Sequence, residues 1–143
     1  MASNMEPQAK TPARDEKLGP LWGARVLIVE DDFFIAMELE SIFSDAGGEV
    51  VGLCRTVKDA LVSAKAEDLA VAILDFQMGE ETTVGVAQIL AGRQVPFAFY
   101  TGHAEIEPLC TNWPECKVVS KPARPQALVN AVADLLRENR AGA

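Results

Sequence analysis

The sequence predicts an α/β domain built on a doubly wound, five-stranded parallel sheet. Short apolar runs alternate with helical periodicities from about residue 24 to residue 138, without an internal repeat. Two of these runs, Arg25–Asp32 and Ala70–Met78, pass abruptly from apolar residues into carboxylates. This pattern is typical of buried parallel strands that bring acidic side chains to one edge of a sheet.

The bulk properties restrict the class of protein. The chain has 143 residues, 49% of them hydrophobic and 24% charged, which fits one ordinary globular domain. A formal net charge of -8 argues against nucleic acid as a direct partner, because no basic surface is available. No apolar run is long enough to cross a bilayer and the start of the chain lacks a signal-peptide core, so we expect a cytoplasmic protein without a membrane partner.

The cysteines and the first residues carry no structural signal of their own. Cys54, Cys110 and Cys116 are odd in number and lack C-x-x-C spacing, so no disulfide is expected and all three are interpreted as small residues in or near the core. Residues 1–22 are rich in Pro, Gly and polar residues and are predicted to form a disordered leader, with Leu21 and Trp22 as candidates for packing on the domain edge. The folded domain is predicted over residues 23–140.

The first half of the domain is predicted to contain two strand–helix units. Strands are expected over 25–30 and 49–54. Asp32 and Thr56 stand where a short oxygen side chain caps a helix, and Gly47–Gly48 end the first helix. The predicted buried faces of the two helices are Ile35, Leu39, Ile42 and Ala46, and Val57, Ala60, Leu61 and Ala64.

The second half continues the alternation with one irregular segment. The predicted elements are a strand ending at Asp75, a helix over 82–92, a strand over 96–100, a strand over 117–120 and a helix over 125–138. The predicted buried faces of the two helices are Val86, Ile89 and Leu90, and Leu128, Val132 and Leu135. Residues 104–115 contain Pro108 and Trp113–Pro114, so a fourth helix is predicted to be shortened or lost.

The strand ends define a candidate metal site. In the flavodoxin-like order 2-1-3-4-5, the first and third strands lie side by side at the switch point of the sheet, so Glu30, Asp31 and Asp75 are expected to converge. Clustered carboxylates repel one another unless a cation is present, and an oxygen-only ligand set favours Mg²⁺. One of the three carboxylates is also a candidate nucleophile. Thr101 and Lys121 end neighbouring strands, and a hydroxyl and an ammonium complete a set suited to handling a phosphoryl group.

Four motifs in this order resemble the receiver domain of two-component response regulators, the CheY-like domain. They are V-L-I-V-E-D-D, A-I-L-D-F-Q-M, F-Y-T-G and V-V-S-K-P, and the resemblance covers about residues 24–138. It implies that Asp75 accepts a phosphoryl group from a histidine kinase or a histidine phosphotransfer protein. It also implies that Asp31, Asp75 and the backbone carbonyl of Gln77 bind Mg²⁺, with Glu30 acting mainly through water.

The resemblance further implies that Thr101 and Lys121 contact the phosphoryl oxygens, with Gly102 leaving the approach open. The sequence departs from the family pattern at positions that bear on output. Gly79 replaces a frequent Pro, Val118 replaces the aromatic residue three positions before the lysine, and Ala123 replaces an aromatic that often follows Lys-Pro. F-Y-T-G-H partly matches the F-A-T-G-x-Y motif of a stand-alone receiver subgroup.

Several residues have two interpretations. His103 and Gln77 are candidates for tuning water attack on a phosphoaspartate, and His103 is equally well explained as a loop residue without a role. Phe34 lies off the predicted buried stripe of its helix and is a candidate anchor for a partner protein, with partial burial as the alternative. Asp32 is interpreted as a helix cap in preference to a metal ligand.

These observations predict a single-domain response regulator that signals by protein–protein contacts or by phosphorelay. It is not expected to be an enzyme. Two alternatives are a small Mg²⁺-dependent phosphohydrolase with an aspartyl-phosphate intermediate and a non-phosphorylated pseudo-receiver that only binds. The hydrolase alternative lacks a second acid near the nucleophile, because Gln77 stands two residues after Asp75.

Overall fold

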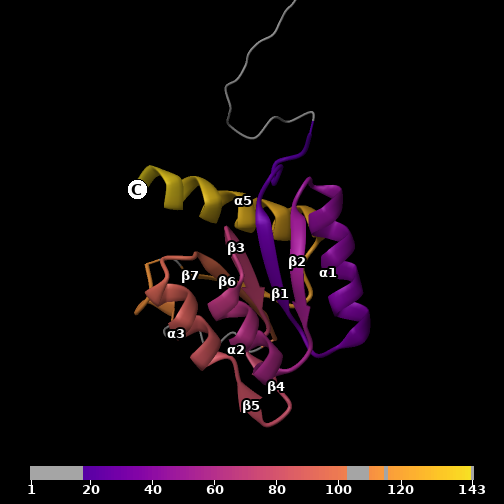
Figure 1. Ribbon diagram of the computed structural model, residues 1–143. Coiled ribbons are helices and arrows are strands. Elements are labelled where there is room, and N and C mark those ends of the chain that lie inside the picture. The colour runs from indigo at the N-terminus through magenta and orange to yellow at the C-terminus, as the bar shows by residue number, and fades with distance from the viewer. Residues whose placement is uncertain (1–17, 103–109, 115, 143) are drawn as a thin grey trace, which may run out of the picture.

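The computed structural model of the chain describes residues 18–102, 110–114 and 116–142. The predicted α/β class is confirmed: a five-stranded parallel sheet has the order β2-β1-β3-β6-β7, which is the predicted order 2-1-3-4-5 (Figure 1). The strands of this sheet are β1 (Arg25–Val29), β2 (Glu49–Cys54), β3 (Val71–Leu74), β6 (Phe97–Thr101) and β7 (Cys116–Ser120). The helices are α1 (Phe33–Asp45), α2 (Val57–Ala66), α3 (Val84–Gly92) and α5 (Pro125–Gly142).

Helices cover both faces of the sheet (Figure 1). Successive residues of β1 point to opposite faces, so Val26 and Ile28 pack with α1 and α5 while Leu27 and Val29 pack with α2 and α3. All four of these side chains are completely buried. The central strands therefore have no solvent-facing side, which explains their almost uninterrupted apolar sequence.

Two helices begin at the predicted caps. The carboxylate of Asp32 accepts a hydrogen bond of 3.0 Å from the backbone N–H of Ile35, and the hydroxyl of Thr56 accepts one of 3.1 Å from the N–H of Asp59. Each bond satisfies a helix N–H that has no partner within the helix. The interpretation of Asp32 as a cap is confirmed.

The buried faces of α1 and α3 differ in part from the prediction. Leu39 of α1 is buried as predicted, but Ala36 and Phe43 are buried in place of Ile35 and Ile42, which are only partly covered. In α3, Ala87 is buried and Ile89 only partly so. Small alanines let these helices approach the sheet closely, and a broad apolar stripe does not reveal which of its residues lies at its centre. The buried face of α5 matches the prediction at Leu128, Val132 and Leu135.

The segment just before β1 packs against the turn between α1 and β2. Leu21 is fully buried, and its N–H donates a hydrogen bond of 2.9 Å to the carbonyl of Ala46. Gly47, with φ +97°, allows this approach, since a Cβ there would lie 2.4 Å from the carbonyl oxygen of Leu18. Trp22 remains half-exposed. Residues 1–17 lie outside the described residues, so the predicted leader stays a prediction.

A small antiparallel hairpin, which was not predicted from the sequence, follows the third strand of the main sheet. Its strands are β4 (Gln77–Met78) and β5 (Glu81–Thr82), and it projects at the carboxyl end of the sheet (Figure 1). Gly79 has φ +66° at the turn, a value that L side chains adopt rarely. The chain thus leaves β3 in a defined conformation despite lacking the frequent Pro at this position.

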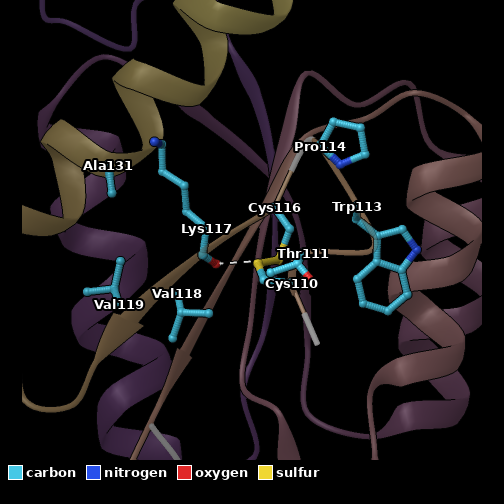
Figure 2. A pocket seen from close by; sticks show the side chains of 9 residues that line it. All are labelled: Cys110, Thr111, Trp113, Pro114, Cys116, Lys117, Val118, Val119 and Ala131. Carbon is cyan, nitrogen blue, oxygen red and sulfur yellow. Dashed lines mark hydrogen bonds between the residues drawn. A yellow bond between two sulfur atoms is a disulfide. The ribbon is translucent and has the colours of Figure 1, made fainter. Parts of the chain in front are cut away.

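The expectation that no disulfide forms is wrong. Cys110 and Cys116 are joined by a disulfide, with their Cα atoms 5.5 Å apart (Figure 2). Two successive turns bring them together, because the N–H of Trp113 donates to the Cys110 carbonyl and the N–H of Cys116 donates to the Trp113 carbonyl. The number and spacing of the cysteines in the sequence do not reveal that the chain turns back on itself here. Cys54 is buried as expected, and burial raises the pKa of its thiol.

Within the described residues, no helix has both the length and the apolar character required to span a membrane. The segment predicted to hold a shortened fourth helix lies largely outside the described residues.

Candidate functional site

The three predicted carboxylates meet at the carboxyl end of the sheet. Glu30 and Asp31 directly follow β1, and Asp75 directly follows its neighbour β3. One carboxylate oxygen from each residue lies within 4.8 Å of the others. Glu30 and Asp75 are buried and Asp31 is exposed, so the cluster opens toward solvent on the Asp31 side. Parallel strand pairing produces this convergence, since Val29 of β1 aligns with Leu74 of β3.

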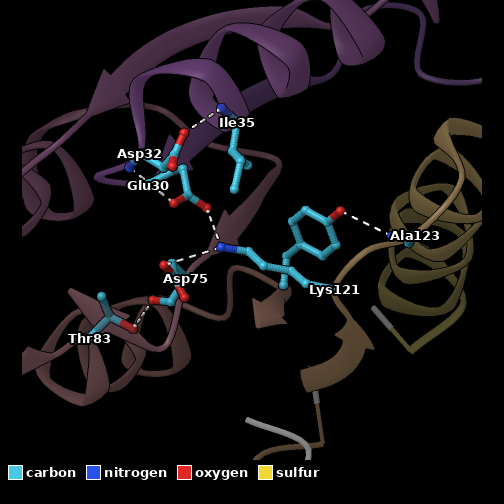
Figure 3. Close-up of polar contacts among 8 residues, drawn as sticks. Glu30, Asp32, Ile35, Asp75, Thr83, Lys121 and Ala123 are labelled. Carbon is cyan, nitrogen blue, oxygen red and sulfur yellow. Dashed lines mark hydrogen bonds and ion pairs between the residues drawn. The ribbon is translucent and has the colours of Figure 1, made fainter. Parts of the chain in front are cut away.

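Lys121 enters the cluster from β7. Its ammonium nitrogen lies 3.0 Å from Oε1 of Glu30 and 3.3 Å from Oδ2 of Asp75 (Figure 3). The backbone N–H of Lys121 donates a hydrogen bond of 2.9 Å to the carbonyl of Thr101, which ties the lysine to the end of β6. The Lys121 ammonium therefore pairs with two of the three carboxylates, and the cluster keeps an excess of negative charge.

The electrostatics of Glu30 reflect this imbalance. Burial raises the pKa of Glu30 from its ordinary value of 4.5 to about 7, with the Lys121 hydrogen bond opposing the rise and the Asp75 charge adding to it. Burial alone would lower the pKa of Lys121, but the hydrogen bond and charge of Glu30 and the charge of Asp75 outweigh burial and raise it. The ionised form of Glu30 is therefore energetically unfavourable in the folded protein, and an added cation would stabilise it.

In the absence of divalent cations, the protein is expected to be more stable at pH 5 than at pH 8. The pKa of Glu30 is higher in the folded protein than its ordinary value of 4.5, so its contribution to stability is fully present below pH 4.5 and is lost as the pH rises through about 7. This pKa shift corresponds to a stability change on the order of 2 kcal/mol between pH 5 and pH 8. Since about 1 kcal/mol shifts the melting temperature of a domain of this size by about 4 °C, we expect the melting temperature in EDTA to fall by roughly 8 °C over this range. Glu30→Gln cannot ionise and should flatten the profile; equal slopes for the two proteins would contradict the assignment.

The donor set fits a hard divalent cation. Three carboxylates supply only oxygen ligands, which suit Mg²⁺ and disfavour zinc. Oε1 of Glu30 is buried, and the contact that the structure gives it is the 3.0 Å ion pair with the Lys121 ammonium. Glu30, Asp31 and Asp75 could each offer one carboxylate oxygen to such an ion.

The other predicted site residues occupy distinct positions around the cluster. Thr101 is fully buried at the end of β6, and Gly102 is exposed with open space where a Cβ would stand. The carboxamide of Gln77 donates to the carbonyls of Gly79 and Glu81 within the β4–β5 hairpin. His103 lies outside the described residues.

The start of α1 presents aromatic surface beside the site. Phe34 is 80% exposed, which excludes partial burial as its explanation. Phe33 is half-exposed and lies under the guanidinium of Arg55, 5.3 Å from the ring centroid. Arg55 also donates a hydrogen bond of 3.2 Å to the carbonyl of Asp31, so it links this surface to the acidic cluster.

Two residues near the site were missed from the sequence. The hydroxyl of Thr83 donates a hydrogen bond of 2.7 Å to the main-chain carbonyl of Asp75 (Figure 3). The ring of Tyr100 lies 5.5 Å from the Lys121 ammonium, and its hydroxyl accepts a hydrogen bond of 3.1 Å from the N–H of Ala123. In the sequence, Tyr100 stands where the F-A-T-G-x-Y motif has Ala, and this difference is a signal that could have found it. No sequence signal distinguishes Thr83 from an ordinary helix cap.

The described fold and site define a doubly wound α/β domain with a cluster of acidic side chains at the carboxyl ends of its strands. The chain belongs to the response regulator receiver domain family, whose sequence model matches residues 26–133. The predicted family resemblance is thereby confirmed. Receiver domains are signalling modules that generally bind Mg²⁺ at such an acidic pocket.

Individual proteins show the same relationship. The chain is 32% identical over 111 residues to the phyllosphere-induced regulator PhyR of Methylorubrum extorquens, a match that covers 75% of this chain and 41% of that protein. The anti-anti-sigma factor PhyR of Bartonella quintana is 27% identical with a TM-score of 0.73, covering 82% of this chain and 50% of that one. A CheY-like receiver domain of Methanospirillum hungatei is 22% identical with a TM-score of 0.76, covering 84% and 98%, and shows the fold alone.

The chain thus spans about half the length of the PhyR proteins or less.

Proposed function

We propose that this chain is a response regulator that accepts a phosphoryl group on Asp75 from a histidine kinase or a histidine phosphotransfer protein. The observation that carries the proposal is the convergence of Glu30, Asp31 and Asp75 within 4.8 Å, with the Lys121 ammonium 3.3 Å from Oδ2 of Asp75. A nucleophilic carboxylate beside an ammonium and a hard-cation site is the arrangement that in-line phosphoryl transfer requires.

Each side chain has a role in the proposed transfer. A carboxylate oxygen of Asp75 attacks phosphorus, an acyl phosphate bond forms, and the bond from phosphorus to the donor imidazole nitrogen breaks. Lys121 and the hydroxyl of Thr101 contact the equatorial oxygens, on which negative charge accumulates. Mg²⁺, when bound by Asp31, Asp75 and the Gln77 carbonyl, would neutralise part of that charge.

The proposed output is a change in the ends of β6 and β7. Phosphorylation adds about 1.5 to 2 negative charges at Asp75. The added group competes for the Lys121 ammonium, which the resting protein shares between Glu30 and Asp75. Because Lys121 also lies against Tyr100 and is hydrogen-bonded to the backbone of Thr101, a shift of the lysine reaches both strands.

The proposed partners are proteins, in the cytoplasm, that meet the domain at the rim of the site. The 80% exposed ring of Phe34 is the proposed anchor for the phosphodonor protein, because exposed aromatic side chains are frequent interface hot spots. The PhyR of Bartonella quintana is named an anti-anti-sigma factor, but only half of that protein matches the present chain. We therefore propose that the matched receiver domain accepts the phosphoryl group, and we assign no particular downstream protein to it.

The test uses acetyl phosphate as a small phosphodonor. The protein is incubated with it in Mg²⁺ or in EDTA, and intact-mass spectrometry counts added phosphoryl groups. We expect one group in Mg²⁺ and none in EDTA. The absence of any addition in Mg²⁺ would favour the pseudo-receiver alternative, and rapid multiple-turnover release of phosphate from phosphomonoesters would favour the hydrolase alternative.

A further inference from the structure

The loop that carries the candidate phosphorylation site is fastened by its own side chains. The carboxamide nitrogen of Gln77 donates hydrogen bonds of 2.9 Å to the carbonyl of Gly79 and 3.2 Å to the carbonyl of Glu81. One side chain of β4 therefore binds both the turn and the opposite strand of the β4–β5 hairpin. A flexible turn at Gly79 is in this way held in a single conformation.

Thr83 closes the base of the same hairpin. It is fully buried and stands at the N-cap position of α3, yet its side chain makes no capping hydrogen bond. Its hydroxyl instead donates 2.7 Å to the carbonyl of Asp75, and its backbone N–H donates 3.0 Å to the carbonyl of Phe76. A helix-capping bond is thus forgone for a bond to the residue that bears the nucleophile.

The backbone of Asp75 is consequently held on both sides. Its N–H donates 2.8 Å to the carbonyl of Val29 in β1, and its carbonyl accepts from Thr83. Two residues further along, the main chain of Gln77 is held by hairpin pairing with Thr82. The carboxylate of Asp75 and the carbonyl of Gln77 leave this segment from fixed positions.

We infer that Thr83 and Gln77 are positioning residues for the divalent cation, acting through Asp75 and through the Gln77 carbonyl. This inference depends on the proposed function, since it assumes that the acidic cluster binds Mg²⁺. Mg²⁺ demands near-octahedral oxygen ligands, so a loop that holds its oxygens in place loses less order on binding. Loss of a hydrogen bond that orients a metal ligand typically weakens metal affinity about 10- to 100-fold.

The experiment measures Mg²⁺ affinity by isothermal titration calorimetry with Mg²⁺ alone, together with the melting temperature of each protein. Thr83→Val keeps the shape of the side chain and removes the hydroxyl, and we expect its dissociation constant to rise about tenfold. Thr83→Ser retains the hydroxyl and should stay close to wild type. Gln77→Leu removes the side-chain amide that spans the hairpin and should also weaken Mg²⁺ binding. If Thr83→Val does not fold, the Mg²⁺ affinity of Gln77→Leu tests the inference in its place.

The matched control is Thr56→Val, which removes a threonine hydroxyl from the N-cap of α2. It should lower the melting temperature and leave Mg²⁺ affinity unchanged, as a purely structural role would. If Thr83→Val or, in its place, Gln77→Leu binds Mg²⁺ as wild type does, the inference is overturned. If the wild type itself binds no Mg²⁺, the proposed function fails first, so the two failures are distinguishable.

Discussion

Asp75→Asn is expected to abolish phosphorylation of the protein by acetyl phosphate. The amide is a far weaker nucleophile than the carboxylate, and the substitution also replaces one of the three charged carboxylates gathered within 4.8 Å with a neutral group. The shape of the side chain is retained, so folding should be preserved. Intact-mass spectrometry in saturating Mg²⁺ should therefore show one added phosphoryl group on the wild type and none on the variant.

Asp32→Asn is the matched control for this prediction. Asp32 lies two residues after Glu30, and its carboxylate caps α1 by accepting a hydrogen bond from the N–H of Ile35. Asparagine caps helices about as well as aspartate, so the variant should be phosphorylated like the wild type.

Asp75→Asn has a second expected effect: it removes a charge that repels Glu30, and it should raise the melting temperature of the Mg²⁺-free protein. Equal labelling of Asp75→Asn and wild type would exclude Asp75 as the acceptor.

Lys121→Gln is expected to slow phosphorylation by about a hundredfold. The ammonium of Lys121 contacts both Glu30 and Asp75. Its loss removes the cation that would face the incoming phosphoryl oxygens, and single donors of this kind typically contribute about 10²- to 10³-fold in rate. The variant also leaves the buried Glu30 without its counter-ion, at a cost on the order of 2 kcal/mol in unfolding free energy without Mg²⁺. The rate of mass increase with acetyl phosphate and thermal denaturation measure the two effects.

Lys117→Gln separates the site from general charge effects. Lys117 lies on β7, the strand that Lys121 directly follows, but its ammonium pairs with Glu138 of α5 at 3.6 Å, and both side chains are partly exposed. Removing one positive charge there should change the phosphorylation rate by less than about threefold and stability by less than about 1 kcal/mol. A Lys121→Gln rate as close to wild type as that of the control would contradict the assigned role.

The acidic corner of the molecule was predictable because it depends on strand ends alone. Once β1 and β3 are assigned as neighbouring parallel strands, Glu30 and Asp75 must meet, and Lys121 arrives by the same rule from β7. Helix caps at Asp32 and Thr56 were predictable for a similar reason, since a cap depends on one residue and the N–H groups just after it.

The features that escaped prediction depend on how distant or turning segments meet. A threonine before a helix is an ordinary cap in sequence, and only the fold shows the Thr83 hydroxyl turned toward Asp75. The Cys110–Cys116 disulfide follows from two consecutive turns that residue spacing does not encode. Leu21 was a candidate for packing on the domain edge, but its burial against the turn at Gly47 was not visible in the sequence.

The packing of Trp113 provides the molecule with an optical reporter. Its indole lies against the rings of Phe97 and Phe99 in β6, with centroid distances of 5.7 and 6.5 Å, and β6 ends at Thr101. The chain has two tryptophans, and the other, Trp22, is half-exposed just before the amino end of β1, at the opposite end of the sheet from Thr101. Indole emission is sensitive to its surroundings, so a rearrangement of β6 would change the fluorescence of an unlabelled protein in real time.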